Sequence, residues 1–332
     1  MRLSLLTLAT STIMFWLAQA APHHNHHHHH SSDIDVGSHH NNSSTTIVPG
    51  KHFDRVVIIV FENKDYSTAM KNKYLKSLPG RHNGMLDENA HTHNAIIIKL
   101  IHWCSFYIGV LLTNYHGTSH PSQPNYIAMI SGSTKGTKED DESNFDRDTI
   151  VDLLEKKQIS WKTYQEDYPG GCNSHMDIDN YARKHNPFIS FKNIRNNKER
   201  CANIVNADQL DNDIKDDKVP QYVYYTPNLK NDAHDTDMDY GAKWLKKFLE
   251  PRIKKSAFSK NTMFVVTFDE DDSNTKSNRV YAALFGPDFK RSSKSRKDHK
   301  KYDHYSLLRT IENNWDLGDL GQHDKDAVGF DL

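Results

Sequence analysis

The chain has almost no net charge, few cysteines and no long uninterrupted apolar run. Lys and Arg total 42 against 43 Asp and Glu, which gives a formal net charge of −1. This balance gives no electrostatic reason to expect a nucleic-acid partner. An apolar stretch at residues 95–112 is interrupted by Lys99 and His102, whereas a membrane helix needs about 20 apolar residues. We therefore expect neither nucleic-acid binding nor a stable membrane span.

Residues 1–20 have the pattern of a secretory signal peptide, with Arg2, an apolar core and a small-x-small end at residues 18–20. The alternative, an N-terminal anchor helix, requires a longer apolar core. Residues 21–50 are rich in His, Ser and Asn and cannot form a packed core. Their His run fits a solvated linker or an affinity tag better than a metal site. Two overlapping glycosylation sequons begin at Asn41 and Asn42, so we expect a secreted glycoprotein, extracellular or in the cell wall, whose folded domain spans residues 51–332.

Only three cysteines are present, Cys104, Cys172 and Cys201. Secretion favours disulfide formation, and Cys172 and Cys201 both lie in polar, loop-like sequence. We predict that these two form a disulfide. Cys104 is then unpaired, and it lies within the apolar stretch described above.

Apolar runs of strand length alternate with amphipathic segments of helix length. Strands are predicted at residues 54–61, 159–164, 219–225, 262–268 and 280–285. Helices are predicted at residues 66–78, 124–130, 148–158, 240–253 and 305–315. This alternation predicts an α/β fold with a mostly parallel central sheet flanked by helices on both faces.

Acidic side chains follow two of the predicted strands. Asp269 and Glu270 come directly after one strand, and Glu62 and Asn63 come directly after the first. Open α/β sheets bind ligands at the carboxyl ends of their strands. Clustered carboxylates repel one another unless a cation lies between them. The two strand ends therefore predict one divalent-metal site, although Asn63 taken alone also fits a helix cap.

Ser122 stands at the start of a predicted helix, just before Pro124. Free backbone N–H groups at a helix N-terminus can hold phosphoryl oxygens. A bound metal can lower the pKa of a hydroxyl enough to make it a nucleophile. Ser122 is therefore a candidate nucleophile, and the competing interpretation is that its side chain only caps the helix.

Two polar segments carry candidate proton donors. His234 and Asp235 follow a predicted strand, and His304 precedes the last predicted helix. Histidine is suited to proton transfer because its ordinary pKa lies near neutrality. Each segment also fits a local role, a polar turn in the first case and a helix cap at Asp303 or Ser306 in the second.

Five motifs follow one another along the chain: Phe61-Glu62-Asn63, His120-Pro121-Ser122-Gln123-Pro124-Asn125-Tyr126, Thr226-Pro227-Asn228 with Asp232-Ala233-His234-Asp235, Thr267-Phe268-Asp269-Glu270, and Tyr302-Asp303-His304-Tyr305-Ser306. Together they resemble the secreted fungal acid phosphatases. Those enzymes belong to a phosphoesterase family that also contains bacterial phospholipases C, within the alkaline-phosphatase-like superfamily. The match extends from about His52 to the C-terminus, and it implies an alkaline-phosphatase-like fold that hydrolyses phosphate monoesters.

The resemblance implies a role for each matching residue. Ser122 would be the nucleophile and would form a phosphoserine intermediate, activated by one divalent metal ion, which could be Ca, Mg, Mn or Zn. His304 or His234 would protonate the leaving group, and histidines charged in mild acid would add positive charge around the phosphate. The implied metal ligands are Glu62, Asn63, Ser122, Asp269 and Glu270, and the implied substrate contacts are His120, Asn125 and Asp235.

Residues 87–111 depart from the family pattern, because in the pattern residue 86 joins almost directly to residue 112. We hypothesise that this apolar segment is a translated, unspliced intron or a gene-model error. The alternative is a real insertion that forms a surface element. Sequencing the transcript distinguishes the two, since a message that keeps these codons contradicts the intron hypothesis.

Two other functions are compatible with the sequence. One is a phosphodiesterase of the phospholipase C type on the same scaffold. The other is a catalytically inactive surface or metal-binding homologue. The presence of Glu62, Asn63, Ser122 and Asp269 argues against an inactive protein. The sequence gives no indication of the physiological substrate or of the oligomeric state.

Overall fold

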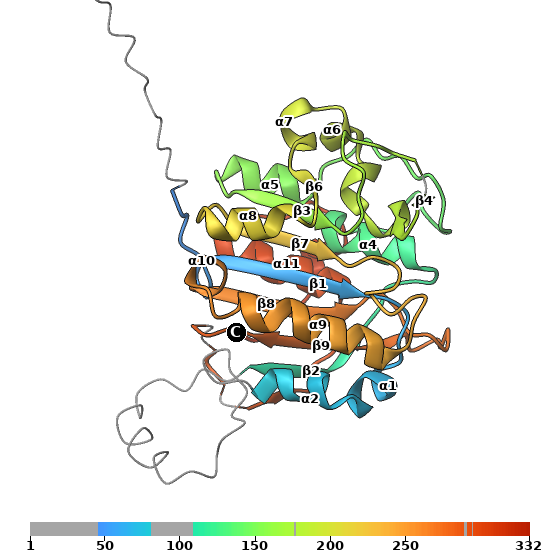
Figure 1. The fold of residues 1–332 in the computed structure, drawn as a ribbon, viewed down its shortest axis with the longest axis vertical. Coiled ribbons are helices and arrows are strands. Elements are labelled where there is room, and N and C mark those ends of the chain that lie inside the picture. The colour runs from blue at the N-terminus through green and yellow to red at the C-terminus, as the bar shows by residue number, and fades with distance from the viewer. Residues whose placement is uncertain (1–45, 81–108, 176, 289–290, 294) are drawn as a thin grey trace, which may run out of the picture. The chain divides into compact units, whose positions relative to one another are not determined.

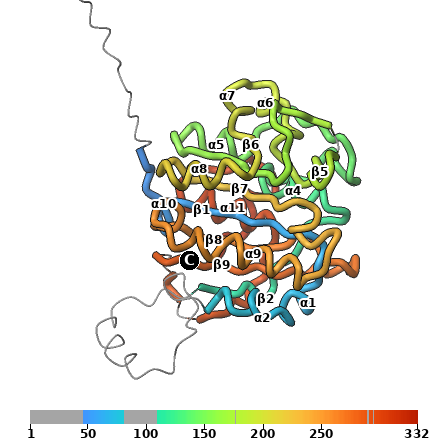
Figure 2. Tube along the Cα trace, viewed as in Figure 1, coloured from blue at the N-terminus to red at the C-terminus, as the bar shows by residue number. Residues whose placement is uncertain are grey.

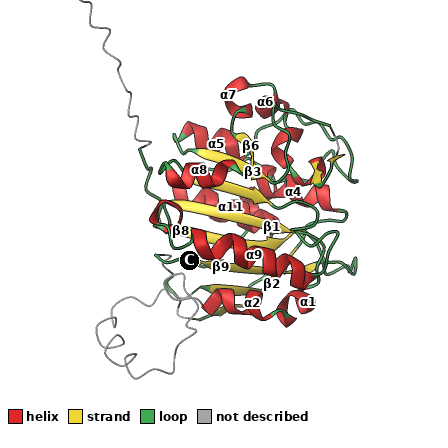
Figure 3. Ribbon diagram, in the orientation of Figure 1, coloured by secondary structure: helices red, strands yellow, loops and turns green. Residues whose placement is uncertain are grey.

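The computed structural model describes residues 46–80, 109–175, 177–288, 291–293 and 295–332. A central sheet has helices on both faces, and Figure 1 shows α9 (Met238–Arg252) on the near face and α11 (His304–Trp315) on the far face. Figure 3 shows the same layers by element type. The predicted α/β class is therefore confirmed.

The sheet is mostly parallel. Its strands are β1 (Arg55–Phe61), β2 (Val110–His116), β3 (Trp161–Gln165), β6 (Ile204–Asn206), β7 (Tyr222–Thr226), β8 (Thr262–Phe268), β9 (Arg279–Phe285), β10 (Lys297–Asp298) and β11 (Tyr302–Asp303). Within the described residues the strand order is β10-β2-β9-β8-β1-β7-β3-β6, and β11 pairs with β2. Only β9 runs antiparallel to its neighbours there, β2 and β8. A separate hairpin joins β4 (Asp177–Ile178) and β5 (Tyr181–Ala182).

The other helices, including single 3-10 turns labelled η, are α1 (Tyr66–Lys71), α2 (Lys73–Ser77), η1 (Leu78–Gly80), α4 (Ser122–Ser131), α5 (Ile150–Lys156), η2 (Arg183–His185), η3 (Pro187–Ser190), α6 (Lys192–Arg195), α7 (Lys198–Cys201), α8 (Gln209–Lys215), α10 (Ser256–Ser259) and α12 (His323–Asp326). Most predicted elements differ from these bounds by no more than a few residues. The predicted helix at residues 66–78 is wrong as one helix. It breaks at Asn72, whose backbone is extended and whose side chain accepts hydrogen bonds from Tyr74 N and Leu75 N to cap α2.

The strands β1 and β8 form the centre of the sheet and position the site. All residues of both strands are buried, as expected for parallel strands covered on both faces. They pair in parallel along their whole length, up to Phe61 opposite Phe268. Figure 2 shows these two strands side by side, although one is near the start of the described chain and the other is far along it. The residues that follow them therefore emerge at the same edge of the sheet.

The link between β8 and β9 explains the antiparallel pair. Residues 269–278 join the two strands, and this connection is too short for the crossover that a parallel neighbour requires. The chain therefore turns back at the edge where the acidic residues lie. The turn carries Asp269, Glu270 and Asp271, all of them buried.

Several predictions concern residues outside the described ones: the signal peptide at residues 1–20, most of the linker at residues 21–50, the sequons at Asn41 and Asn42, and Cys104. Residues 87–108 of the expected insertion also lie outside them. Val110 and Leu111, however, are the first two residues of β2 and are buried. These two residues therefore belong to the sheet.

The predicted disulfide is confirmed. Cys172 and Cys201 are bonded, with their Cα atoms 5.8 Å apart. Within the part of the chain that the structure describes, no helix is both long enough and apolar enough to cross a bilayer.

Candidate active site

The two acidic strand ends meet, as the sequence predicts. Asp269 N donates to Phe61 O at 3.0 Å. Two residues after Phe61, Asn63 N donates to the side chain of the same Asp269, at Oδ1, at 3.2 Å. Asn63 has a φ of 36°, a left-handed conformation that Asn tolerates better than most residues. The turn after β1 therefore bends Glu62 and Asn63 towards the end of β8.

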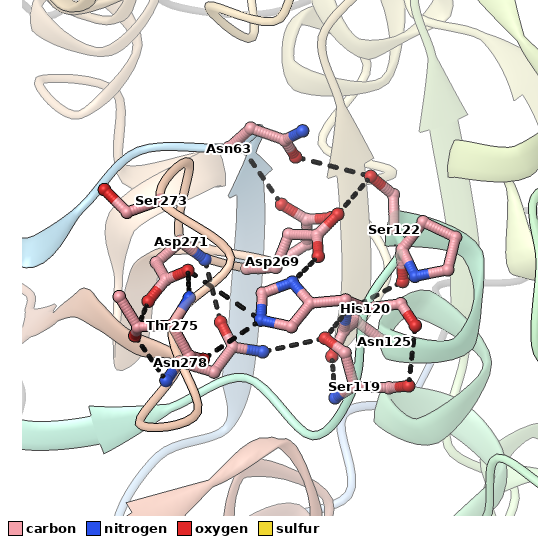
Figure 4. A network of polar contacts seen from close by, with 12 residues as sticks. Asn63, Ser119, His120, Ser122, Asn125, Asp269, Asp271, Ser273, Thr275 and Asn278 are labelled. Carbon is pink, nitrogen blue, oxygen red and sulfur yellow. Dashed lines mark hydrogen bonds and ion pairs between the residues drawn. The ribbon is translucent and has the colours of Figure 1, made fainter.

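The hydroxyl of Ser122 lies among these side chains (Figure 4). Its Oγ is 2.9 Å from Glu62 Oε2, 3.0 Å from Glu270 Oε1 and 3.3 Å from Asn63 Oδ1. Ser122 is the first residue of α4, whose N-cap is Pro121 and which has no side-chain cap. The interpretation of Ser122 as a helix cap is therefore wrong, and its hydroxyl instead contacts the acidic strand ends.

The oxygens around Ser122 outnumber the hydrogens available to them. One hydroxyl proton can be donated to one acceptor, yet three acceptor oxygens lie within 3.3 Å of Oγ. In addition, Asp269 Oδ2 is buried without a hydrogen-bond partner among the described residues. Buried oxygens facing one another in this way need a proton or a cation between them.

The pKa values of Glu62, Asp269 and Glu270 also indicate that negative charge is unfavourable here. Burial, followed by the charges of Asp269 and Asp232, raises the pKa of Glu62 well above its ordinary value. Burial and the charge of Glu270 raise the pKa of Asp269. Burial also raises the pKa of Glu270, against the opposing hydrogen bond from His120. The three acids therefore resist carrying their full negative charge together.

The donor set fits a hard divalent cation. Carboxylate, carboxamide and hydroxyl oxygens from Glu62, Asn63, Ser122, Asp269 and Glu270 are the kinds of ligand that Ca, Mg and Mn prefer. Among the described residues, however, no group of three or more His, Cys, Asp or Glu side chains already has the geometry to hold a metal ion. Glu62, Asn63 and Glu270 instead direct oxygens at Ser122 Oγ. The unpartnered Asp269 Oδ2 is the atom that most clearly lacks a positive partner.

His120 belongs to the same cluster. Its Nδ1 bonds to Glu270 Oε2, and its Nε2 lies 3.3 Å from Thr275 O. Figure 4 shows the ring between the residues that precede α4 and the loop that follows β8. His120 therefore joins the two loops that carry Ser122 and Glu270.

His304 and Asn125 bond to backbone atoms of the loops that carry the cluster. His304 is fully buried, its Nε2 donates to the carbonyl of Asp269 at 2.6 Å, and its Nδ1 lies 2.9 Å from Tyr115 Oη. Burial lowers the pKa of His304 to about 4, so this ring does not supply the positive charge expected of it in mild acid. Asn125 Oδ1 accepts from the backbone of Thr118 and Ser119. Proton donation by His304 and substrate contact by Asn125 stay predictions. The contacts that the structure shows for these two side chains fix the backbone of the loops around the site.

His234 and Asp235 lie on the loop after β7. Asp235 Oδ1 is 2.7 Å from His234 Nδ1, and both side chains are partly exposed. His234 N also donates to Asp232 Oδ1 at 2.8 Å. The pair therefore lies at an accessible position, and no contact with Ser122 is seen among the described residues.

The sequence analysis missed residues that hold Glu62. Tyr126 Oη donates to Glu62 Oε1 at 2.6 Å, and His185 Nε2 lies 3.1 Å from the same oxygen, although no hydrogen bond joins the two within the described residues. On its other side, His185 Nδ1 is 3.5 Å from Asp232 Oδ2. Tyr126 could have been found, because it lies four residues after Ser122 on the same helix face. His185 has no comparable signal in the sequence.

The N-terminus of α4 also differs from expectation. The N–H of Gln123 is not free for a phosphoryl oxygen, because it donates to Asp140 Oδ1 at 2.9 Å. Asp140 Oδ2 in turn bonds to Lys184 Nζ at 2.9 Å. Neither residue was singled out in the sequence, since each lies in a charged loop segment.

Comparisons with known proteins agree with the motifs. A probable acid phosphatase of Kluyveromyces lactis is 37% identical over 289 residues, covering 84% of this chain and 62% of its own. An acid phosphatase of Aspergillus fumigatus is 33% identical over 289 residues, covering 83% and 58%. This chain thus spans about three fifths of the length of these relatives. A solved protein of the alkaline phosphatase superfamily from Vibrio parahaemolyticus aligns at 16% identity and a TM-score of 0.46, covering 83% of this chain and 70% of that one.

The pattern of the Phosphoesterase family matches residues 100–318. This range contains Ser122, His234, Asp269 and His304, and the fungal relatives match beyond it at 33% identity or more. The chain therefore belongs to the Phosphoesterase family.

Proposed function

We propose that the protein hydrolyses phosphate monoesters at acidic pH through Ser122. The observation that carries the proposal is the position of the Ser122 hydroxyl, within 3.3 Å of oxygens from Glu62, Asn63 and Glu270. The names of the fungal relatives, which are acid phosphatases, support the same activity. The signal-peptide pattern and the disulfide support action outside the cell.

The proposed metal ligands are Glu62, Asn63, Ser122, Asp269 and Glu270. A divalent cation bound there supplies the positive charge that lowers the pKa of the Ser122 hydroxyl and offsets charge on the phosphoryl oxygens. The unpartnered Asp269 Oδ2 and the surplus of acceptors around Oγ support this ligand set. The identity of the cation does not follow from oxygen ligands alone.

The reaction is proposed to take two displacements. Ser122 Oγ attacks phosphorus in line with the leaving oxygen, and its proton passes to a neighbouring carboxylate such as Glu270, whose Oε1 is 3.0 Å away. The product is phosphoserine and an alcohol. Water then attacks phosphorus, the bond to Oγ breaks, and Ser122 recovers its proton as inorganic phosphate forms.

We assign protonation of the leaving oxygen to His234 in preference to His304. His234 is partly exposed, and Asp235 holds its Nδ1 at 2.7 Å. Such a carboxylate orients the ring. His304 is fully buried, and both of its ring nitrogens already have protein partners.

The test is phosphate release from an aryl phosphate monoester between pH 4 and pH 8, with and without a chelator. We expect chelator-sensitive release that peaks in acid and that Ser122→Ala lowers by at least about 1,000-fold. Ser131→Ala is the matched control, because Ser131 is a buried serine of the same helix whose hydroxyl donates to Ile127 O. Equal activity in Ser122→Ala and Ser131→Ala would refute the assignment, and faster release from an aryl diester would favour a phosphodiesterase.

A further inference from the structure

A carboxylate of the protein occupies the place of an anion at the N-terminus of α4. Asp140 Oδ1 accepts the N–H of Gln123 at 2.9 Å, and Gln123 directly follows Ser122. Asp140 Oδ2 bonds to Lys184 Nζ at 2.9 Å. A helix N-terminal N–H together with an ammonium group is a combination that binds phosphate. Here both groups are bonded to one side chain of the protein.

Gln123 gives a second, independent indication that this place binds a ligand. The residue is fully buried, and its Nε2 has no hydrogen-bond partner among the described residues. Its Oε1 accepts from Asp141 N at 3.1 Å, so the carboxamide lies against the same loop as Asp140. A buried N–H group without an acceptor is unfavourable, so a ligand that offers an acceptor is stabilised there. A phosphoryl oxygen is such an acceptor.

Lys184 is electrostatically linked to the acidic cluster. It belongs to η2, and the next residue, His185, contacts Glu62. The ammonium charge of Lys184 acts on the carboxylates of both Glu62 and Asp269. The side chains of Lys184 and Asp140 are 17% and 27% exposed, so solvent can reach this ion pair.

We propose that Asp140 sets the affinity of the site for phosphate by competing with the phosphoryl group for Lys184 and for the α4 N-terminus. The proposal rests on the function proposed above, since it assumes that phosphate binds next to Ser122. A phosphate-bearing anion draws Lys184 away from Asp140 and offers it an equivalent partner. Lys184 therefore always has an anionic partner, and phosphate leaves easily because Asp140 takes its place.

Two substitutions test the competition, because it predicts effects of opposite sign. Asp140→Asn keeps a side-chain oxygen for the Gln123 N–H but removes the charge that holds Lys184. We expect it to tighten binding of inorganic phosphate by about three- to tenfold and to lower KM for an aryl phosphate similarly. Lys184→Met removes the cation, and we expect about tenfold weaker phosphate binding and a higher KM.

Binding of inorganic phosphate is measured by isothermal titration calorimetry on the full chain, and KM is measured separately. Lys162→Met is the matched control, because Lys162 forms a similar half-buried ion pair with Asp213, at 2.6 Å, and neither residue belongs to the site. If the Asp140–Lys184 pair only braces the fold, both site variants shift phosphate affinity in the same direction, and the proposal is overturned. It is also overturned if neither variant differs from Lys162→Met.

The calorimetric measurement separates this proposal from the proposed function. Opposite shifts in phosphate affinity in a protein that hydrolyses no monoester would support Asp140 as the affinity-setting residue and refute the phosphatase. Hydrolysis that depends on Ser122, without opposite shifts, would support the phosphatase and refute the role of Asp140.

Discussion

The hydroxyl of Tyr126 and the ring of His185 both lie against one oxygen of Glu62. Tyr126 Oη is 2.6 Å from Oε1 and His185 Nε2 is 3.1 Å from it, while Ser122 Oγ is 2.9 Å from Oε2. The His185 ring stacks on Tyr126 with centroids 5.1 Å apart. Because one oxygen is held, the other is directed at Ser122. Tyr126 and His185 thus orient the Glu62 carboxylate that Ser122 contacts.

We predict that His185→Gln lowers kcat by about 10- to 100-fold and leaves KM nearly unchanged, because outer partners of a ligand orient it without touching substrate. Steady-state kinetics and the melting temperature are measured together. His323→Gln is the control, since the His323 ring also packs against a tyrosine, Tyr305, in a tilted arrangement with centroids 4.9 Å apart. A rise in KM alone, or a loss of activity that follows the loss of stability, would contradict the positioning role.

At the same scale, local sequence explains why some site residues were predicted and others were not. Glu62 and Asp269 each directly follow an apolar strand, so a short window of sequence reveals them. His185 reaches Glu62 only because η2 packs against α4, two segments that are distant in the sequence. No pattern of spacing encodes that contact. The burial of His304 was missed for the same reason, because the groups that cover it come from other elements.

At the scale of elements, α11 and α12 bury two carboxyl groups near each other. Burial, followed by the charge of Asp324, raises the pKa of Glu312 to about 8. An unfolded chain ionises Glu near pH 4.3. Between these values the folded protein holds more protons than the unfolded chain, so its free energy of unfolding falls as pH rises. This junction therefore favours folding in acid.

We predict that Glu312→Gln weakens the fall of the free energy of unfolding with rising pH. The amide cannot ionise, so the variant should gain roughly 1–3 kcal/mol over the parent protein at pH 8 and little at pH 4. Urea denaturation at pH 4, 6 and 8 measures the difference. If the two proteins lose stability with pH at the same rate, Glu312 does not ionise in this range.

The helix boundaries show which capping residues can be recognised in the sequence. The predicted helix at residues 66–78 ignores Asn72, although Asn is a preferred N-cap and its side chain caps α2 here. A cap at Asp303 or Ser306 was the alternative interpretation of the segment before the last helix, and Asp303 is the N-cap of α11, with Ser306 completing a capping box. A cap inside an apolar pattern is harder to recognise than one at its start, because the apolar spacing continues across it.

At the scale of the whole molecule, the class of the fold was predictable and the strand order was not. Strands such as β8 are buried on both faces and read as continuous apolar runs. The strands β10 and β11 have two residues each, so they carry no periodicity. They exist because β2 offers them hydrogen-bonding partners. Pairing between distant segments is a property of the assembled sheet.

We predict that the disulfide stabilises the molecule without taking part in catalysis. The bond closes a loop across 29 residues, for which loop-closure entropy gives about 3–4 kcal/mol. The double variant Cys172→Ser/Cys201→Ser should lose about that free energy of unfolding in guanidinium and keep its kcat under native conditions. A large loss of kcat at full folding would show instead that this part of the chain shapes the site.

The ladder between β1 and β8 continues to Phe61 and Phe268, the last residues before Glu62 and Asp269. The backbone beneath these two acids therefore separates only if the centre of the sheet opens. Local fluctuations of a protein spare its central strands and concentrate in loops. Glu62 and Asp269 thus stay together as long as the protein is folded, whereas Asp140, on a loop, can yield to a substrate without disturbing them.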